Sequence, residues 1–326
     1  MLPRRRPAAW LLLVVFLGFL SCHHVANARP APAAAAGLHR HQSGAAWRRS
    51  FKHLQDTGRG SRVAGLAELK RYLARFGYMH LTAEHDDAFD GHMEAAVKRY
   101  QSRLSLPVTG RLDAATLGRI VSPRCGVGDG GARVSVSLSD SAASRFTFLD
   151  GEPRWTGPEP LVLTYSISSA ATVDYLPGDA VRAAIRGAFA RWARIIPVEF
   201  VETHHDDSYR AADITVGFYE GDHGDDSPFD GQGSVLAHAF EPKDGRLHFD
   251  AAERWTVDVG SETASSAVDL ESVATHEIGH ILGLGHSSSP AAVMYPYIDF
   301  GERKGGPQRG RHRWHSATVW FQLAVE

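Results

Sequence analysis

Three histidines within eleven residues constrain this chain more than any other feature of its sequence. Positions 276 to 286 read HEIGHILGLGH. On a helix, His276 and His280 lie one turn apart on the same face, so both imidazoles can reach one metal ion. His286 can join them only if the chain turns back, and Gly283 can adopt the left-handed backbone that ends a helix. We therefore predict a helix, a turn and a zinc site made by these histidines.

Three histidine ligands leave one tetrahedral position open for water, which distinguishes a catalytic zinc from a closed structural one. Zinc lowers the pKa of such a water to about 7. Glu277 could accept the water's proton during attack on a peptide carbonyl and pass it to the departing amine. An isolated glutamate on a helix would more simply be a surface residue, but the position of Glu277 beside two ligands favours a general base.

The N-terminus has the pattern of a secretory signal peptide. Three arginines at positions 4–6 precede an apolar run over 10–20, and the small-x-small sequence Ala26-Asn27-Ala28 follows. The run is short for a bilayer span, so we expect cleavage after Ala28, with a retained signal anchor as the alternative. The product would be secreted to the extracellular space, matrix or cell wall, with no transmembrane segment.

The cysteine count limits how the exported chain can be cross-linked. The only two cysteines are Cys22 and Cys125, which excludes a disulfide-rich scaffold and a zinc site built from cysteines alone. Signal cleavage would remove Cys22 and leave Cys125 as a single thiol in an oxidising compartment. Such an unpaired cysteine requires a role or a protected position.

The charge balance excludes some classes of partner. The 326 residues, enough for about two domains, carry 35 basic and 37 acidic side chains and a net charge of −2. This offers no general attraction to nucleic acid or to an anionic membrane surface. We expect no nucleic-acid partner.

Hydrophobic spacing indicates a helical region followed by a mixed region. Helical patterns over 63–76, 93–104 and a short stretch after Asp113 predict three helices, with Gly77 ending the first and Asp113 capping the third. Beyond about residue 153, strands are expected at 161–167, 198–201, 214–219, 235–240 and 247–249, with a helix over 179–193. This succession predicts an α+β fold.

Two motifs identify the family that this chain resembles. The histidine stretch, followed by Ala292-Val293-Met294-Tyr295-Pro296, resembles the metzincins, with Met294 at the position of the Met-turn residue. Upstream, residues 123–129 read PRCGVGD and resemble the cysteine-switch motif of the matrix metalloproteinases, or matrixins, with glycine at 128 where proline is usual. The resemblance implies that Cys125 binds the zinc in a zymogen, which suits a thiolate. An inert buried cysteine is the alternative.

The resemblance also implies metals that hold the fold. A structural zinc would take the residues that match its four matrixin ligands, His223, Asp225, His238 and His248. An adjacent calcium would take the side chains of Asp230, Asp250 and Glu253 and the backbone oxygens of Gly231, Gly233 and Val235. A second calcium site of the family is not carried over, because Arg246 stands where an aspartate is usual.

The implied architecture is an α+β metzincin catalytic domain, with a twisted mixed five-stranded sheet and long helices. A small three-helix prodomain resembling peptidoglycan-binding modules precedes it. With no haemopexin-like module after the catalytic domain, the chain resembles the short plant matrixins. A substrate would lie extended along the edge strand near 235–239. Pro296, Tyr297 and Ile298 would wall the pocket for the residue after the scissile bond. The expected protein is a monomer that cleaves extracellular proteins or peptides and is open to protein inhibitors.

The expected domain plan has six parts, and its last part departs from the family. After Lys304 the chain lacks the amphipathic helix pattern that matrixins have there, for which we favour an altered reading frame or splice form. The parts are the signal peptide 1–28, a disordered linker 29–50, the prodomain 51–122, the cysteine-switch and activation segment 123–152, the catalytic domain 153–300 and an atypical tail 301–326.

Two other functions remain open at this stage. The altered tail could leave a metal-binding but catalytically impaired protein that acts by binding substrates or inhibitors. The N-terminal domain could instead be a module for wall polysaccharide, although no stripe of sugar-binding aromatic residues stands out.

Overall fold

The computed structural model describes residues 51–80, 86–129, 147–203 and 211–306. All of them belong to one unit of the chain, which spans 41–326. The predicted signal peptide and linker, most of the activation segment and the tail beyond 306 lie outside the described residues. Within the described ranges, no helix is both long and apolar enough to span a bilayer.

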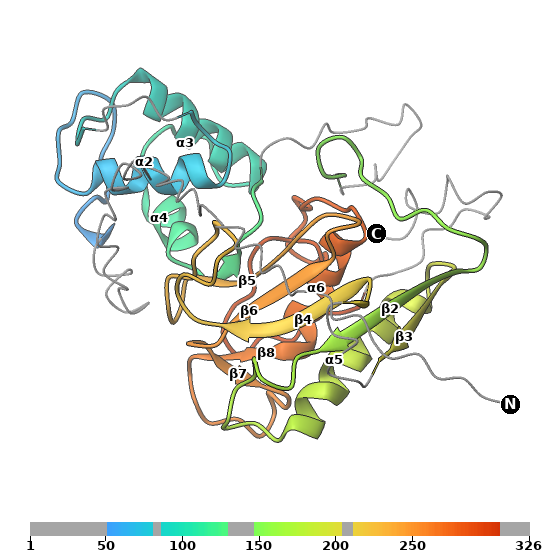
Figure 1. Cartoon of the computed structure of the whole chain (residues 1–326). Coiled ribbons are helices and arrows are strands. Elements are labelled where there is room, and N and C mark those ends of the chain that lie inside the picture. The colour runs from blue at the N-terminus through green and yellow to red at the C-terminus, as the bar shows by residue number, and fades with distance from the viewer. Residues whose placement is uncertain (1–50, 81–85, 130–146, 204–210, 307–326) are drawn as a thin grey trace, which may run out of the picture. The chain divides into compact units, whose positions relative to one another are not determined.

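The N-terminal part contains the three predicted helices, α2 (Leu66–Arg75), α3 (Gly91–Arg103) and α4 (Ala114–Ile120) (Figure 1). Gly77 follows α2 with φ +83°, a left-handed conformation that favours glycine and ends the helix as predicted. The Asp113 carboxylate accepts a hydrogen bond from the Thr116 amide at 2.8 Å, which confirms the predicted cap of α4. The apolar faces of these helices form one buried cluster.

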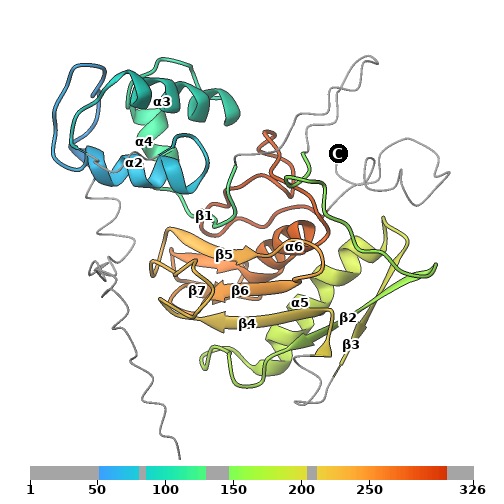
Figure 2. The same ribbon diagram turned by 45° about the horizontal axis from the view of Figure 1, so that its top comes forward.

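The C-terminal part is built on a mixed sheet in the order β1-β5-β6-β4-β2-β3 (Figure 2). All neighbouring strands run parallel except β5 and β6, which are antiparallel. The strands are β1 (Arg124–Cys125), β2 (Leu161–Ile167), β3 (Val198–Glu202), β4 (Ile214–Tyr219), β5 (Val235–Ala239) and β6 (Arg246–Asp250). Five of them confirm the predicted five-stranded sheet, and β1, from the PRCGVGD segment, adds a sixth strand.

A short second sheet completes the strands. It pairs β7 (Arg254–Thr256) with β8 (Ala267–Asp269), which the sequence patterns did not predict because each strand has three residues, too few to show an alternation.

Helices α5 (Gly178–Ala193) and α6 (Leu270–Ile281) pack on one face of the large sheet (Figures 1 and 2). Nearly every residue of α6 is buried, as expected for a helix that crosses a domain core. Its N-terminal Ser272 amide is capped by Asp269 at 3.0 Å. Beyond its end, Gly283 has φ +95°, and a Cβ there would overlap the Pro153 carbonyl oxygen. The predicted turn at Gly283 is therefore confirmed.

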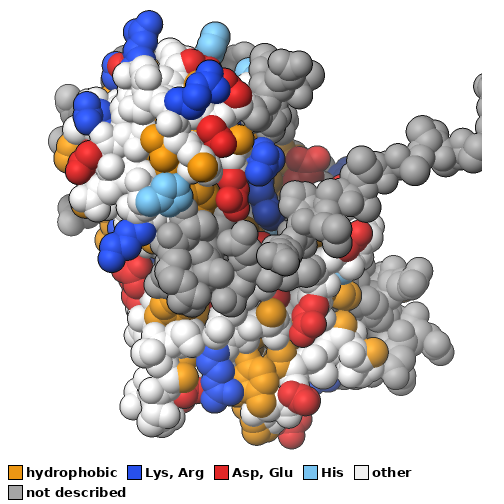
Figure 3. Space-filling model, turned by 90° about the vertical axis from the view of Figure 1, so that its left-hand side faces the viewer, with side chains coloured by type: hydrophobic (Ala, Val, Ile, Leu, Met, Phe, Trp, Pro, Cys, Tyr) orange, Lys and Arg blue, Asp and Glu red, His pale blue; other side chains and the backbone are white. Residues whose placement is uncertain are grey.

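The surface shows no segregation of charge on the face drawn in Figure 3. Lysine, arginine, aspartate and glutamate side chains are interspersed there rather than gathered by sign. This mixture matches the near-neutral net charge of the sequence.

Candidate active site

The three histidines of the HEIGHILGLGH stretch converge with their Nε2 atoms. His280 Nε2 lies 3.1 Å from His276 Nε2 and 3.1 Å from His286 Nε2. Their opposite ring nitrogens are engaged: His276 Nδ1 lies 2.7 Å from the Val293 carbonyl oxygen and His280 Nδ1 lies 2.7 Å from the Leu284 carbonyl oxygen. His286 Nδ1 lies 2.6 Å from the Asp129 carboxylate.

This geometry fits a zinc ion. Because each Nδ1 faces an oxygen acceptor, it carries the proton of the neutral ring and leaves an unprotonated Nε2. Burial lowers the pKa of all three imidazoles, that of His276 to about 3, so no imidazolium proton bridges them. Three converging lone pairs need a cation between them. The spacing is close to the roughly 3.3 Å that tetrahedral zinc–nitrogen bonds imply.

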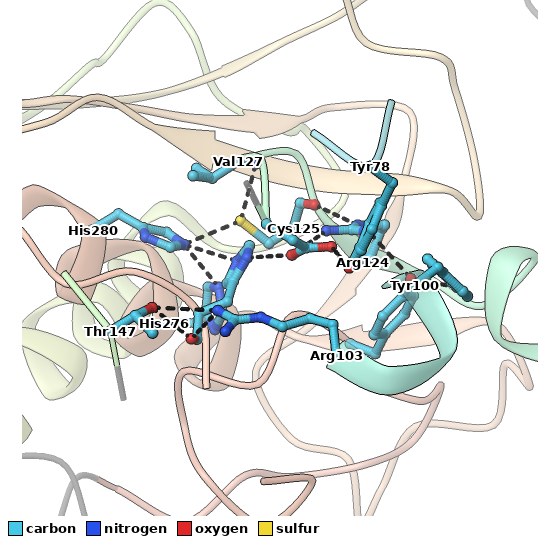
Figure 4. Close-up of polar contacts among 12 residues, drawn as sticks. Tyr78, Tyr100, Arg103, Arg124, Cys125, Val127, Thr147, His276 and His280 are labelled. Atoms are coloured by element: carbon cyan, nitrogen blue, oxygen red, sulfur yellow. Dashed lines mark hydrogen bonds and ion pairs between the residues drawn. The ribbon is translucent and has the colours of Figure 1, made fainter. Parts of the chain in front are cut away.

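Cys125 completes a four-ligand set with these histidines. Its Sγ lies 3.4 Å from His280 Nε2, and all four ligand atoms lie within 4.8 Å of one another (Figure 4). Strand β1 holds it there, since the Cys125 amide donates to the Pro296 carbonyl at 2.9 Å and the Gly126 amide donates to the Ala237 carbonyl at 2.7 Å. The thiol is buried, and burial raises its pKa well above the usual value.

Glu277 is buried beside the histidines, on α6. Neither of its carboxylate oxygens accepts a hydrogen bond of ordinary geometry among the described residues, although the Cys125 thiol lies close enough to interact with the carboxylate. Burial raises the pKa of Glu277 to about 8. A buried carboxylate whose only neighbour of this kind is a thiol is costly to keep in a protein interior, so this carboxylate is placed for a ligand or water.

Met294 lies under the helix that carries the histidines. It is fully buried, and a Cβ added at Gly279 would overlap its Sδ atom, so the thioether packs directly on the helix backbone. The neighbouring Val293 carbonyl fixes the His276 ring. The segment thus packs against the helix and orients one of the three imidazoles.

The three predicted pocket residues, Pro296, Tyr297 and Ile298, line a cavity that also includes Cys125 and Glu277. Tyr297 has contacts that the sequence did not reveal. Its hydroxyl lies 3.1 Å from the Tyr72 hydroxyl on α2 and 2.8 Å from the Tyr100 hydroxyl on α3.

Sequence reasoning also missed the buried pair of Arg124 and Asp129. Arg124 donates to Asp129 at 2.9 Å, donates to the Tyr297 hydroxyl at 3.1 Å and covers the Phe76 ring. Tyr78 donates to the other Asp129 oxygen at 2.6 Å. Although burial alone would raise it, the pKa of Asp129 is held below its usual range by Arg124. Both residues belong to the PRCGVGD motif, so their opposite charges were the available signal.

A second cluster contains the four predicted ligands of a structural zinc. One oxygen of Asp225 lies 2.8 Å from His223 Nε2, His238 Nε2 and His248 Nδ1. His223 Nδ1 faces the Gly221 carbonyl, so its Nε2 presents a lone pair toward a carboxylate oxygen. Burial lowers the pKa of His238 and of His248 to about 4. Two acceptors this close require a cation, and the set fits zinc.

The predicted calcium side chains come together from two segments: Asp230 lies before β5, Asp250 is the last residue of β6, and Glu253 follows it. Backbone amides of Gly231, Gly233 and Val235 donate to them. Burial raises the pKa of Asp250 to about 7 and of Glu253 to about 8, and the neighbouring acids add to both. The buried Glu253 Oε2 has no partner among the described residues. Clustered carboxylates with an orphaned oxygen fit a hard divalent cation.

The fold and the histidine set define a zinc metalloendopeptidase, and comparison with known proteins shows its family. Residues 154–307 match the matrixin family model, and residues 62–120 match that of a putative peptidoglycan binding domain. The chain belongs to the matrixin family.

Its relatives include plant and animal enzymes. The chain is 49% identical to Metalloendoproteinase 1-MMP of Arabidopsis thaliana, over 79% of its own length and 69% of the relative's. It is 43% identical to Metalloendoproteinase 1 of Glycine max, over 75% and 78%. It is 37% identical to human Matrilysin, over 74% and 81%.

Proposed function

We propose that this metalloendopeptidase is a secreted zymogen, kept inactive by Cys125 and cleaving extracellular proteins once its propeptide is removed. The observation that carries the proposal is the position of the Cys125 thiol, 3.4 Å from His280 Nε2 and within one four-atom ligand set. A thiolate there would fill the coordination position that a catalytic water needs.

The chemistry follows from the residues around that position. Zinc held by His276, His280 and His286 would polarise the peptide carbonyl and lower the pKa of the attacking water. Glu277 would remove the proton from the water and deliver it to the amine nitrogen as the peptide bond breaks. Its raised pKa suits a group that accepts and then returns a proton.

The propeptide and a substrate would compete for the same strand edge. In the zymogen, Arg124 and Cys125 pair with β5, the outer strand of the catalytic sheet. An extended peptide could form the same kind of main-chain hydrogen bonds after the propeptide leaves. The side chain of the residue that follows the scissile bond would then enter the cavity lined by Pro296, Tyr297 and Ile298. The largely apolar lining of this cavity favours a hydrophobic side chain.

We further propose the domain plan and metal content predicted from the sequence. Signal cleavage after Ala28 would account for export, and the Gly/Ser/Asp-rich segment between Val127 and Asp150 is where we propose activating proteolysis. The second zinc would bind His223, Asp225, His238 and His248, and calcium would bind Asp230, Asp250, Glu253 and nearby backbone oxygens. These ions would act as cross-links in a domain that has no disulfide.

The test is activation of the secreted chain. Residues 29–326 are expressed, treated with an organomercurial or with trypsin, and assayed on a quenched peptide in parallel with Glu277→Ala. The proposal expects activity to rise on treatment in the wild-type chain only. Equal rates in the two proteins would refute the enzyme function and leave a metal-binding protein that captures substrates or inhibitors.

A further inference from the structure

The three zinc-site histidines differ in where their outer hydrogen bonds come from. His276 and His280 are oriented by the carbonyls of Val293 and Leu284, which belong to the catalytic domain itself. His286 is oriented by the Asp129 carboxylate, which belongs to the cysteine-switch segment, at 2.6 Å. One of the three ligands therefore depends on a part of the chain that activation would remove.

Asp129 is held rigidly for this contact. Arg124 donates to the same oxygen at 2.9 Å, and Tyr78 donates to the other oxygen at 2.6 Å. The Asp129 and Arg124 side chains are 0% and 1% exposed, so solvent does not weaken their interaction. An ionised acceptor shared in this way fixes the ring plane of His286.

A prodomain side chain also holds the backbone of His286. Arg103, on α3, donates to the His286 carbonyl oxygen at 2.9 Å, and Thr147 donates to the same oxygen at 2.8 Å (Figure 4). The third ligand is thus held by its ring and by its main chain from outside the catalytic domain.

Resting on the zymogen function proposed above, we propose that the propeptide retains the catalytic zinc through Asp129 as well as through Cys125. Asp129 is a positioning residue that orients His286 and increases the basicity of its Nε2. Outer partners of this kind change metal affinity by about 10- to 100-fold. Removal of the propeptide then costs the zinc site both the thiolate ligand and the carboxylate behind His286.

The experiment measures zinc release rather than proteolysis. The zinc-loaded zymogen, residues 29–326, and its Asp129→Asn variant are mixed with a coloured chelator, and the rate of zinc transfer is followed. Asparagine keeps the shape and an acceptor oxygen but removes the charge. We expect release from the catalytic site to be about 10- to 100-fold faster in Asp129→Asn. The His280→Ala variant, which loses the catalytic ion, identifies the signal of the structural zinc.

A matched control separates ligand positioning from propeptide docking. Tyr78→Phe removes a different hydrogen bond to Asp129 and leaves His286 Nδ1 paired, so its zinc release should stay near the wild-type rate. In each variant, docking is measured as the reactivity of Cys125 toward a thiol reagent with zinc in excess.

Fast release from Asp129→Asn with a protected thiol supports the proposal. The proposal is overturned if Asp129→Asn releases zinc at the wild-type rate. It is also overturned if zinc release is fast only in variants whose Cys125 thiol has become reactive. The zymogen function fails differently: a Cys125→Ser chain that is as inactive and as slow to lose zinc as wild type would refute the switch itself.

Discussion

The hydroxyl of Tyr297, in the wall of the cavity that includes Glu277, lies 2.8 Å from the hydroxyl of Tyr100 on helix α3. Both side chains are fully buried, and the Tyr72 hydroxyl and Arg124 share the same hydrogen-bond network. The N-terminal helices α2 and α3 are therefore hydrogen-bonded directly to Tyr297, the residue proposed to shape substrate selectivity.

Replacing Tyr100 by phenylalanine should loosen the prodomain. The change removes one buried hydrogen bond, worth about 1 kcal/mol, with little change in shape. We expect the Cys125 thiol to react about fivefold faster with a thiol reagent, while the activated enzyme keeps its normal rate. Tyr175→Phe serves as the control, because Tyr175 bonds within the catalytic domain. Equal reactivity in Tyr100→Phe and wild type would contradict the role of this network.

Replacing each of the two glycines of the PRCGVGD motif by alanine should have opposite effects on the stability of the latent form. At Gly126, a Cβ would lie 2.8 Å from Val235 Cγ1 and 3.2 Å from the Ala237 oxygen, so Gly126→Ala should push β1 away from β5 and weaken latency. At Gly128, the nearest atom would be 3.8 Å away and φ is not left-handed. Gly128→Ala should therefore stabilise the zymogen by about 0.4–1 kcal/mol.

Melting temperature and thiol reactivity of the two zymogens check this pair. If both substitutions weakened latency alike, steric fit between the motif and β5 would not control docking.

Glu277→Gln should abolish most peptide cleavage while leaving the metal site intact. Glutamine is isosteric but cannot accept the proton, and loss of a general base costs about 10²- to 10⁴-fold. The zinc content, measured by atomic absorption, should equal that of the wild type. A variant that had lost zinc would show instead that Glu277 supports the metal site.

Without calcium, stability should fall as pH rises. Folding raises the pKa of Asp250 to about 7 and that of Glu253 to about 8, whereas in the unfolded chain both groups ionise near pH 4. The unfolded state therefore becomes more stable relative to the folded state, and the free energy of unfolding falls, as pH rises from about 4 to about 8. The melting temperature of zinc-loaded, calcium-free protein should drop by several degrees between pH 5 and pH 8.

Calcium should cancel that loss, because it binds the ionised carboxylates. Added calcium is expected to raise the melting temperature more at pH 8 than at pH 5, and Glu253→Gln should reduce both the pH slope and the calcium response. Full chelation with EDTA should unfold the catalytic domain as well as inhibit it. An unchanged melting temperature in EDTA would rule out structural metals.

Local patterns were sufficient for most elements of the fold. The positions of α3, α5 and the five catalytic strands follow from hydrophobic spacing, because each buries one face or both faces over at least five residues. Strand β1 could not be foreseen, since its two residues become a strand only by pairing with β5. The same holds for β7 and β8.

By itself, the sequence predicted the chemistry of this protein: two histidines one helical turn apart, a glycine that ends the helix, a third histidine and Cys125 indicate one metal site and its ligands. Only the tertiary structure decided which distant segments meet. Tyr100 and Tyr297, 197 residues apart, and Asp129 and His286, 157 residues apart, meet because the N-terminal helices and the PRCGVGD segment pack against the matrixin domain. Spacing along the chain encodes contacts within a helix or turn, whereas contacts between distant segments depend on packing.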